Sequence, residues 1–126
     1  MKFLIDENLS AKMARSLRSI DQDVDHVTEV LPQGSPDTEV LEFAGANGYF
    51  LITKDNRIRY KPNEKAALKK HKVGVFLLGG KNVGFFETYQ QLIRNWGKIL
   101  ECAAETRRPF VRRIRRTGST IDVVAI

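Results

Sequence analysis

Short apolar runs alternate along the chain with segments in which apolar residues recur every three or four positions. The runs have the length of buried strands, and the spacing between them is that of helices with one face on a core. The pattern predicts strands at residues 2–5, 24–27, 49–53 and 73–78, each followed by a helix or loop. Strands that alternate with helices are typical of a mostly parallel sheet with helices on both faces.

The helices carry clear boundary signals. Ser35 is a good N-cap, Pro36 suits the first helical position, and Asn47-Gly48 closes that helix. After the fourth strand we expect one long amphipathic helix, with an inner side formed by Phe86, Tyr89, Leu92, Ile93, Trp96, Ile99 and Leu100. Residues 109–115 and 119–126 then predict a C-terminal hairpin that turns near Thr117-Gly118.

Length and composition favour a single domain over residues 1–126, because 126 residues with 42% hydrophobic content can close one core around a sheet. The opening MKFLI is too short for a signal peptide, and no apolar run approaches the roughly 20 residues of a membrane span. We therefore expect a cytoplasmic protein with no membrane partner. Cys102 with His26 and His71 makes a poor zinc set, and a lone cysteine forms no internal disulfide.

Charge is divided unevenly along the chain. Residues 1–60 hold 7 Lys or Arg against 10 Asp or Glu, whereas residues 61–126 hold 14 against 5, within a total net charge of +6. An acidic group beside a basic surface suits a metal-dependent enzyme acting on a polyanion, since acids collect cations and basic groups collect phosphates.

Two of the predicted strands are followed almost at once by an aspartate. Asp6 follows FLI, and Asp55 follows LITK. The carboxyl ends of parallel strands share one edge of the sheet, so the two acids are expected to meet there. Asp37 and Glu39 lie in the first turn of the helix that starts at the same edge. Carboxylates crowded in this way repel one another unless a cation neutralises them, and oxygen ligands suit Mg²⁺ or Mn²⁺.

Several of these acids also suit a role without a metal. Asp37 and Glu39 fit the positive end of a helix, and Glu7 fits a cap or solvent. Acids at a sheet edge are equally typical of phospho-acceptor receiver domains. A receiver domain is disfavoured, because VFLLGG supplies neither the lysine nor the hydroxyl that such a domain uses after its later strands.

Four segments in order, FLIDENLS, HV, SPDTEVLEFA and FLITKDNRIRY, resemble the PIN-like domain family within the PIN-domain nuclease superfamily, which includes VapC-type toxins. The resemblance covers about the first 80 residues. It implies a three-layer α/β/α sandwich with a central mostly parallel sheet, and RNA cleavage by acids that hold Mg²⁺ or Mn²⁺. It assigns the catalytic and metal-binding roles to Asp6, Asp37 and Asp55. Beside these, we expect Glu7 and Glu39 to be further metal ligands, because both lie near the same edge of the sheet.

The resemblance is incomplete at one position. A PIN domain has a fourth acid after its next strand, where VFLLGGKN has none, so Glu7, Glu39 or Glu64 is left to take that place.

Substrate contacts are expected from polar and basic residues. Asn56 and Arg57 follow Asp55 and are placed to contact a substrate phosphate. The last strands carry Arg112, Arg113, Arg115 and Arg116, which suit RNA or an acidic antitoxin, although charge on both faces also suits a protected edge strand. Tyr60 and Phe110 are candidates to stack on bases, although packing against the protein is the expected role of each.

These observations predict a Mg²⁺- or Mn²⁺-dependent endoribonuclease, the toxin of a toxin–antitoxin pair. Its expected partners are single-stranded or tRNA-like RNA and an acidic antitoxin, and a homodimer is left open. The alternative is a non-catalytic PIN-like module that binds RNA or protein through its arginine-rich end.

Overall fold

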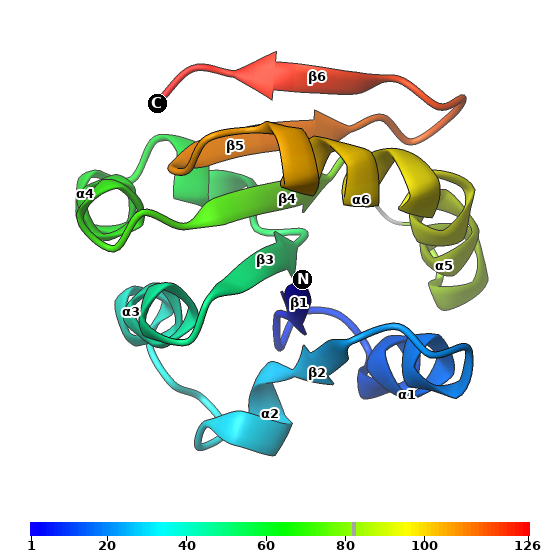
Figure 1. Cartoon of the computed structure of the whole chain (residues 1–126), viewed down its shortest axis with the longest axis horizontal. Coiled ribbons are helices and arrows are strands. Elements are labelled where there is room, and N and C mark those ends of the chain that lie inside the picture. Colours follow the sequence, from blue (N-terminus) through cyan, green and yellow to red (C-terminus); the bar gives the residue numbers. More distant parts are fainter. Residues whose placement is uncertain (82) are drawn as a thin grey trace.

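The computed structural model describes residues 1–81 and 83–126 and contains one mixed sheet flanked by helices (Figure 1). The strands are β1 (Lys2–Ile5), β2 (Val24–His26), β3 (Tyr49–Thr53), β4 (Gly74–Leu78), β5 (Phe110–Ile114) and β6 (Ile121–Val124). The helices are α1 (Ala11–Ser19), α2 (Val27–Val30), α3 (Asp37–Ala46), α4 (Pro62–Lys70), α5 (Phe85–Arg94) and α6 (Trp96–Glu105), with a short 3₁₀ helix η1 (Asn56–Arg59). Among the described residues the strand order is β2-β1-β3-β4-β5-β6, and only the β5–β6 pairing is antiparallel.

Two apolar clusters sandwich the sheet and give three layers. One cluster joins the sheet to α1, α5 and α6, and the other joins it to α3 and α4 (Figure 1). The fully buried strand β4 shows the alternation: Phe76 and Leu78 belong to the first cluster, and Val75 and Leu77 to the second. The α/β/α sandwich with a mostly parallel sheet and a C-terminal hairpin is therefore confirmed.

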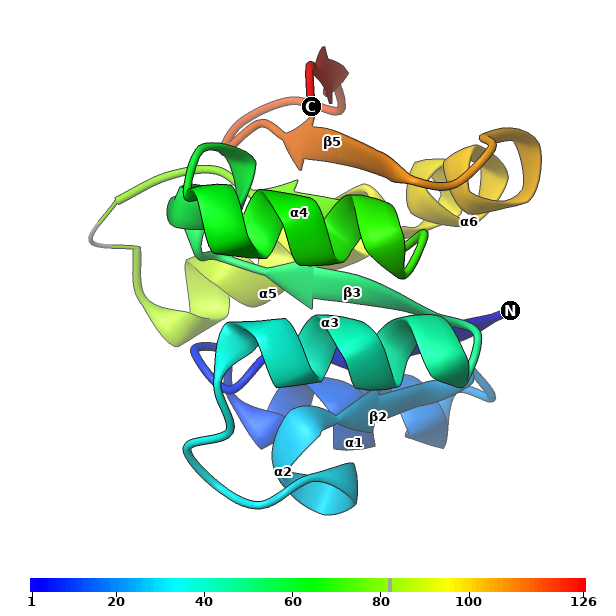
Figure 2. The same cartoon turned by 90° about the vertical axis from the view of Figure 1, so that its left-hand side faces the viewer.

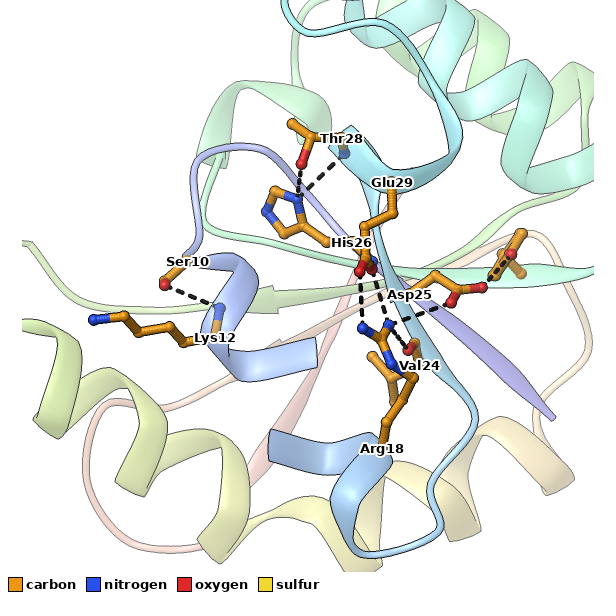
Figure 3. Close-up of polar contacts among 9 residues, drawn as sticks. Ser10, Lys12, Arg18, Val24, Asp25, His26, Thr28 and Glu29 are labelled. Atoms are coloured by element: carbon orange, nitrogen blue, oxygen red, sulfur yellow. Dashed lines mark hydrogen bonds and ion pairs between the residues drawn. The ribbon is translucent and has the colours of Figure 1, made fainter. Parts of the chain in front are cut away.

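The second strand is shorter than predicted, because His26 ends it and begins a helix (Figure 3). The His26 side chain accepts from the Thr28 amide, and the Glu29 carboxylate accepts from the His26 amide at 2.7 Å. This reciprocal cap satisfies two amides at the helix start. The bidentate Arg18 guanidinium lowers the pKa of Glu29 to about 2 and holds the cap against α1. His26 thus has a structural role in the turn that leads toward α3.

The third helix begins one residue later than predicted. Pro36 occupies the N-cap position and Asp37 is the first helical residue, while the Ser35 hydroxyl donates to the Pro32 carbonyl at 2.6 Å. Ser35 therefore closes the preceding turn and does not cap the helix.

The long helix expected after β4 is divided in two at Asn95. The buried Asn95 side chain donates to the Gln91 carbonyl at 2.7 Å, and Gln91 itself donates to the Gly79 and Ile114 carbonyls. Buried polar side chains on the inner face thus replace some of the apolar contacts that the pattern predicted. Phe86 and Ile93, expected inside, are exposed.

The arginine-rich strand β5 lies between β4 and β6, so it is not an edge strand. Phe110, a predicted base-stacking residue, is buried in the core beside Phe50 and Phe76. The prediction that it stacks on bases is therefore wrong, whereas Tyr60 is exposed. None of the helices among the described residues is long and apolar enough to cross a lipid bilayer.

Candidate metal centre

Carboxylates from three elements gather at the carboxyl edge of the sheet. Asp6 follows β1, Asp55 lies two residues beyond β3, and Asp37 opens α3. These three predicted acids line one hollow of about 200 Å³. The parallel topology brings them together, although 49 positions separate Asp6 from Asp55 in the sequence.

A fourth carboxylate, Glu64 in the first turn of α4, joins this group. Helices α3 and α4 pack side by side on one face of the sheet, and both begin at its carboxyl edge (Figure 2). One carboxylate oxygen each from Asp37, Asp55 and Glu64 lie within 4.8 Å of one another. We call Asp6, Asp37, Asp55 and Glu64 the acidic group. Glu7, Glu39 and Glu64 were the candidates for the fourth acid. Among the described residues, Glu64 is the one of these three that approaches Asp37 and Asp55 most closely.

Glu64 is in an unusual state for a glutamate. It is only 7% exposed, and its Oε2 atom has no hydrogen-bond partner among the described residues. A buried, unpaired carboxylate oxygen is costly, so it points to a missing partner such as a proton or a cation. Burial first, and the Asp37 carboxylate second, raise the pKa of Glu64 to about 7.

Asp6 is buried but fully engaged in hydrogen bonds. Its Oδ2 accepts from the Thr53 hydroxyl at 2.7 Å, and its Oδ1 accepts from the Glu7 amide at 2.8 Å. Burial raises the pKa of Asp6, the two hydrogen bonds oppose this rise, and the charges of Asp37 and Asp55 add to it. Asp6 is thus held in a fixed orientation beside the other acids.

Thr53 links the acid of β1 to the acid that follows β3. Its buried hydroxyl donates to Asp6 and accepts from the Asn8 side-chain amide at 3.1 Å and the Asp55 backbone amide at 3.0 Å. Sequence analysis assigned neither Thr53 nor Asn8 to the site. A polar residue closing an apolar strand beside an acid is the signal that could have identified Thr53.

Arg57, predicted to contact substrate, forms a bidentate ion pair with Asp55. Its Nε donates to Oδ1 and its Nη2 to Oδ2, both at 2.9 Å, while the Asp55 side chain also caps η1. These bonds lower the pKa of Asp55. A cation that uses Asp55 must therefore compete with Arg57 for the carboxylate oxygens.

The two further predicted metal ligands lie differently. Glu7 is exposed at the rim of the hollow, where its Oε1 accepts from the Gly34 amide at 2.9 Å in the loop before α3. Glu39 is exposed and lines a separate hollow with Glu42 and Phe43. The structure therefore places Glu7 beside the acidic group and Glu39 outside it.

The predicted substrate-binding residues of the C-terminal half do not form one surface. Arg113 lines a second hollow together with Asn56 at the carboxyl edge of the sheet. Arg112 lies beside α6, and its guanidinium sits 5.3 Å from the Phe110 ring centroid. Arg115 pairs with Asp122 at 2.9 Å within the hairpin, whereas Arg116 is exposed. Among these arginines, Arg113 is therefore the one that shares a hollow with Asn56.

This arrangement can do specific chemistry. Four carboxylates, one of them buried and unpaired, provide oxygen ligands at the edge of an α/β sheet where loops and helix N-termini converge. Such a donor set fits a hard divalent cation, and the basic hollow beside it can hold an anion. The cation would also offset the burial, and the repulsion by Asp37 and Asp55, that raise the pKa of Glu64.

Comparison with known proteins adds the family. The model of the family described as PIN like domain matches residues 1–80, which include all four members of the acidic group. No match to the chain was found among curated proteins or among solved structures. Because the match covers more than half of the 126 residues, and because the fold and the acidic group agree with it, the chain belongs to the PIN-like domain family, part of a nuclease-type superfamily.

Proposed function

We propose that the protein is a Mg²⁺- or Mn²⁺-dependent ribonuclease. The observation that carries this proposal is the buried Glu64 carboxylate beside Asp37 and Asp55, whose Oε2 atom has no hydrogen-bond partner among the described residues. A buried carboxylate oxygen that lacks a donor and lies close to two other carboxylates fits a cation. Family membership supports the nuclease class.

The residues that would hold the cation are Asp37, Asp55 and Glu64, with Asp6 fixed beside them. When bound, a divalent cation supplies a more acidic water and charge neutralisation for a phosphodiester. The chain itself contributes the alignment of the acids. Thr53 orients Asp6, and the packing of α3 against α4 sets the distance between Asp37 and Glu64.

RNA as substrate, and the role of a toxin, are the finer parts of the proposal. The net charge of +6 and the basic hollow beside the acidic group support a polyanionic substrate. The exposed arginines of the β5–β6 hairpin suit docking by an acidic antitoxin. An acidic, antitoxin-sized open reading frame directly beside the gene, whose product co-purifies with this chain, would support the toxin role.

The ribonuclease proposal is tested by incubating excess purified protein with labelled single-stranded RNA and with a tRNA. We expect cutting with Mn²⁺ or Mg²⁺ and none after addition of EDTA, because the acids act only through the cation. Excess protein allows slow turnover to be seen. RNA that stays bound and uncut in both metals would contradict the enzyme and favour a binding module.

The non-catalytic module remains a second candidate because Arg57 already neutralises Asp55. Arg57→Gln tests whether Asp55 binds a metal ion, which the ribonuclease requires and the binding module does not. If Asp55 binds metal, the variant should bind Mn²⁺ several-fold more tightly, since the Arg57 guanidinium no longer competes for the Asp55 carboxylate. The measurement is the Mn²⁺ concentration that half-saturates the rise in melting temperature.

Arg59→Gln is the matched control, because Arg59 lies in the same 3₁₀ helix but pairs with Asn56 and not with an acid. Equal Mn²⁺ affinities for wild type, Arg57→Gln and Arg59→Gln would mean that the Arg57 pair and a cation do not compete for Asp55.

A further inference from the structure

A basic hollow and an aromatic hollow continue the carboxyl edge of the sheet beyond the acidic group. The basic hollow, of about 170 Å³, is lined by Lys54, Asn56, Lys81 and Arg113, with no acidic residue among its described lining. Three cations line this hollow, one of which, Arg113, also lies 3.9 Å from the Asp122 carboxylate. Such a concentration of positive charge attracts an anion the size of a phosphate. None of the acids of the acidic group lines it.

The aromatic hollow, of about 190 Å³, connects the other two through shared residues. Asn8 lines both the acidic hollow and the aromatic hollow, and Lys54 lines both the aromatic hollow and the basic hollow. The Asn8 side-chain oxygen accepts from the Lys54 amide at 3.3 Å, so the two residues that join the hollows are bonded to each other. The three hollows therefore lie next to one another along this edge, and we call them together the track.

Phe85 provides a flat apolar surface in the aromatic hollow. Phe85 is 46% exposed, and its ring stacks on that of Tyr89 with an interplanar angle of 3°. Tyr89 is fixed from behind by a hydrogen bond between its hydroxyl and that of Ser16 in α1. Lys12 lies 5.9 Å from the Phe85 ring centroid and adds positive charge. An exposed, rigidly backed ring among cations is the surface on which an unpaired base stacks.

We propose that this track binds single-stranded RNA, with a base stacked on Phe85 and a neighbouring phosphate held by Lys54 and Arg113. The inference rests on the proposed function, because it gives the path of the same substrate away from the acidic group. Its selectivity follows from geometry: a free base can reach the ring of Phe85, whereas the bases of a duplex are already stacked and paired. Lys54 and Arg113 supply charge but no base preference.

The aromatic part is tested by the binding of a short fluorescent single-stranded RNA in EDTA, where cutting cannot occur. Phe85→Ala and Phe85→Leu should both weaken binding roughly 5- to 100-fold, because leucine fills space without offering a ring. Phe86→Ala is the matched control, since Phe86 is adjacent and more exposed but does not line the hollow. Binding of duplex RNA should be the same for all four proteins.

The basic part is tested with Lys54→Gln and Arg113→Gln against Lys69→Gln and Lys70→Gln. The control lysines lie in the last turn of α4, at the far edge of the sheet. Each change at the track should lower the salt-dependence slope of single-strand binding by about 0.7, and the controls should lower it less.

These results are independent of cleavage. A protein that never cuts RNA but binds single strands through Phe85 and Lys54 would support the proposed RNA track and contradict the proposed ribonuclease activity. Wild-type protein that does not bind single strands, or folded Phe85 and Lys54 variants that bind as wild type does, would overturn the track even if cutting is observed.

Discussion

Replacing Glu64 by glutamine is expected to stabilise the metal-free protein by about 3 kcal/mol at pH 8 and by much less at pH 5. The pKa of Glu64 is raised to about 7 from an ordinary 4.5, and each pKa unit corresponds to about 1.36 kcal/mol. A folded-state pKa above the unfolded value gives stability that is complete below pH 4.5 and is lost as the pH rises through 7. Glutamine does not ionise, so the variant escapes that loss.

Denaturant unfolding in EDTA at pH 5 and pH 8 measures this effect. Glu39→Gln is the control, because it removes the same charge from an exposed position outside the acidic group. Wild type should also gain thermal stability from millimolar Mn²⁺ at pH 8, because a ligand bound only by the native state stabilises it. Glu64→Gln should gain less. A variant no more stable than wild type at pH 8 would mean that the folded protein does not raise the pKa of Glu64.

The proximity of Asp6, Asp37 and Asp55 was predictable from the sequence, because it follows from the order and direction of the strands. Asp6 and Asp55 follow apolar runs, and parallel strands end at one edge, so the pattern was sufficient to place both there. The same reasoning placed Asp37 at the start of a helix that begins at that edge. These predictions needed no knowledge of side-chain contacts, which is why they agreed with the fold.

The choice of the fourth acid needed packing that the sequence does not show. Glu7, Glu39 and Glu64 each follow a predicted strand end or helix start, but only the contact between α3 and α4 brings Glu64 to Asp37. Glu39, two residues after Asp37 in the same helix, points to a different hollow because successive helical positions are about 100° apart. Local pattern could not distinguish these cases.

Local polar contacts account for two other differences. The break at Asn95 arises from hydrogen bonds that the Asn95 and Gln91 side chains donate to backbone carbonyls. A pattern based on apolar residues does not register these two polar residues as part of the inner helix face. The pairing of Arg57 with Asp55 arises from the 3₁₀ turn, which brings residues two apart into contact. Both features depend on backbone geometry at one or two residues, where sequence patterns are least informative.

Asp37→Asn is expected to remove metal-dependent RNA cutting by more than about 100-fold, since loss of even an indirect contact to a metal costs 10–100-fold. Asp37 is the best residue for this test. Asparagine keeps its shape at the first position of α3, whereas Asp55→Asn would also remove the negative charge that pairs with Arg57. Single-strand binding in EDTA should be retained, because the basic hollow lies beyond the acidic group.

The matched control is Glu39→Gln, which removes one negative charge from the same helix outside the acidic group and should cut as wild type does. Cutting that survives in Asp37→Asn at the wild-type rate would come either from a contaminating nuclease or from a site elsewhere on the chain. Purifying Asp6→Asn and Glu64→Gln in parallel extends the test to the other acids, because neither a contaminant nor a distant site responds to substitutions in the acidic group. If all three variants cut RNA as wild type does, the acidic group is not the source of the activity, and its four carboxylates have no catalytic role.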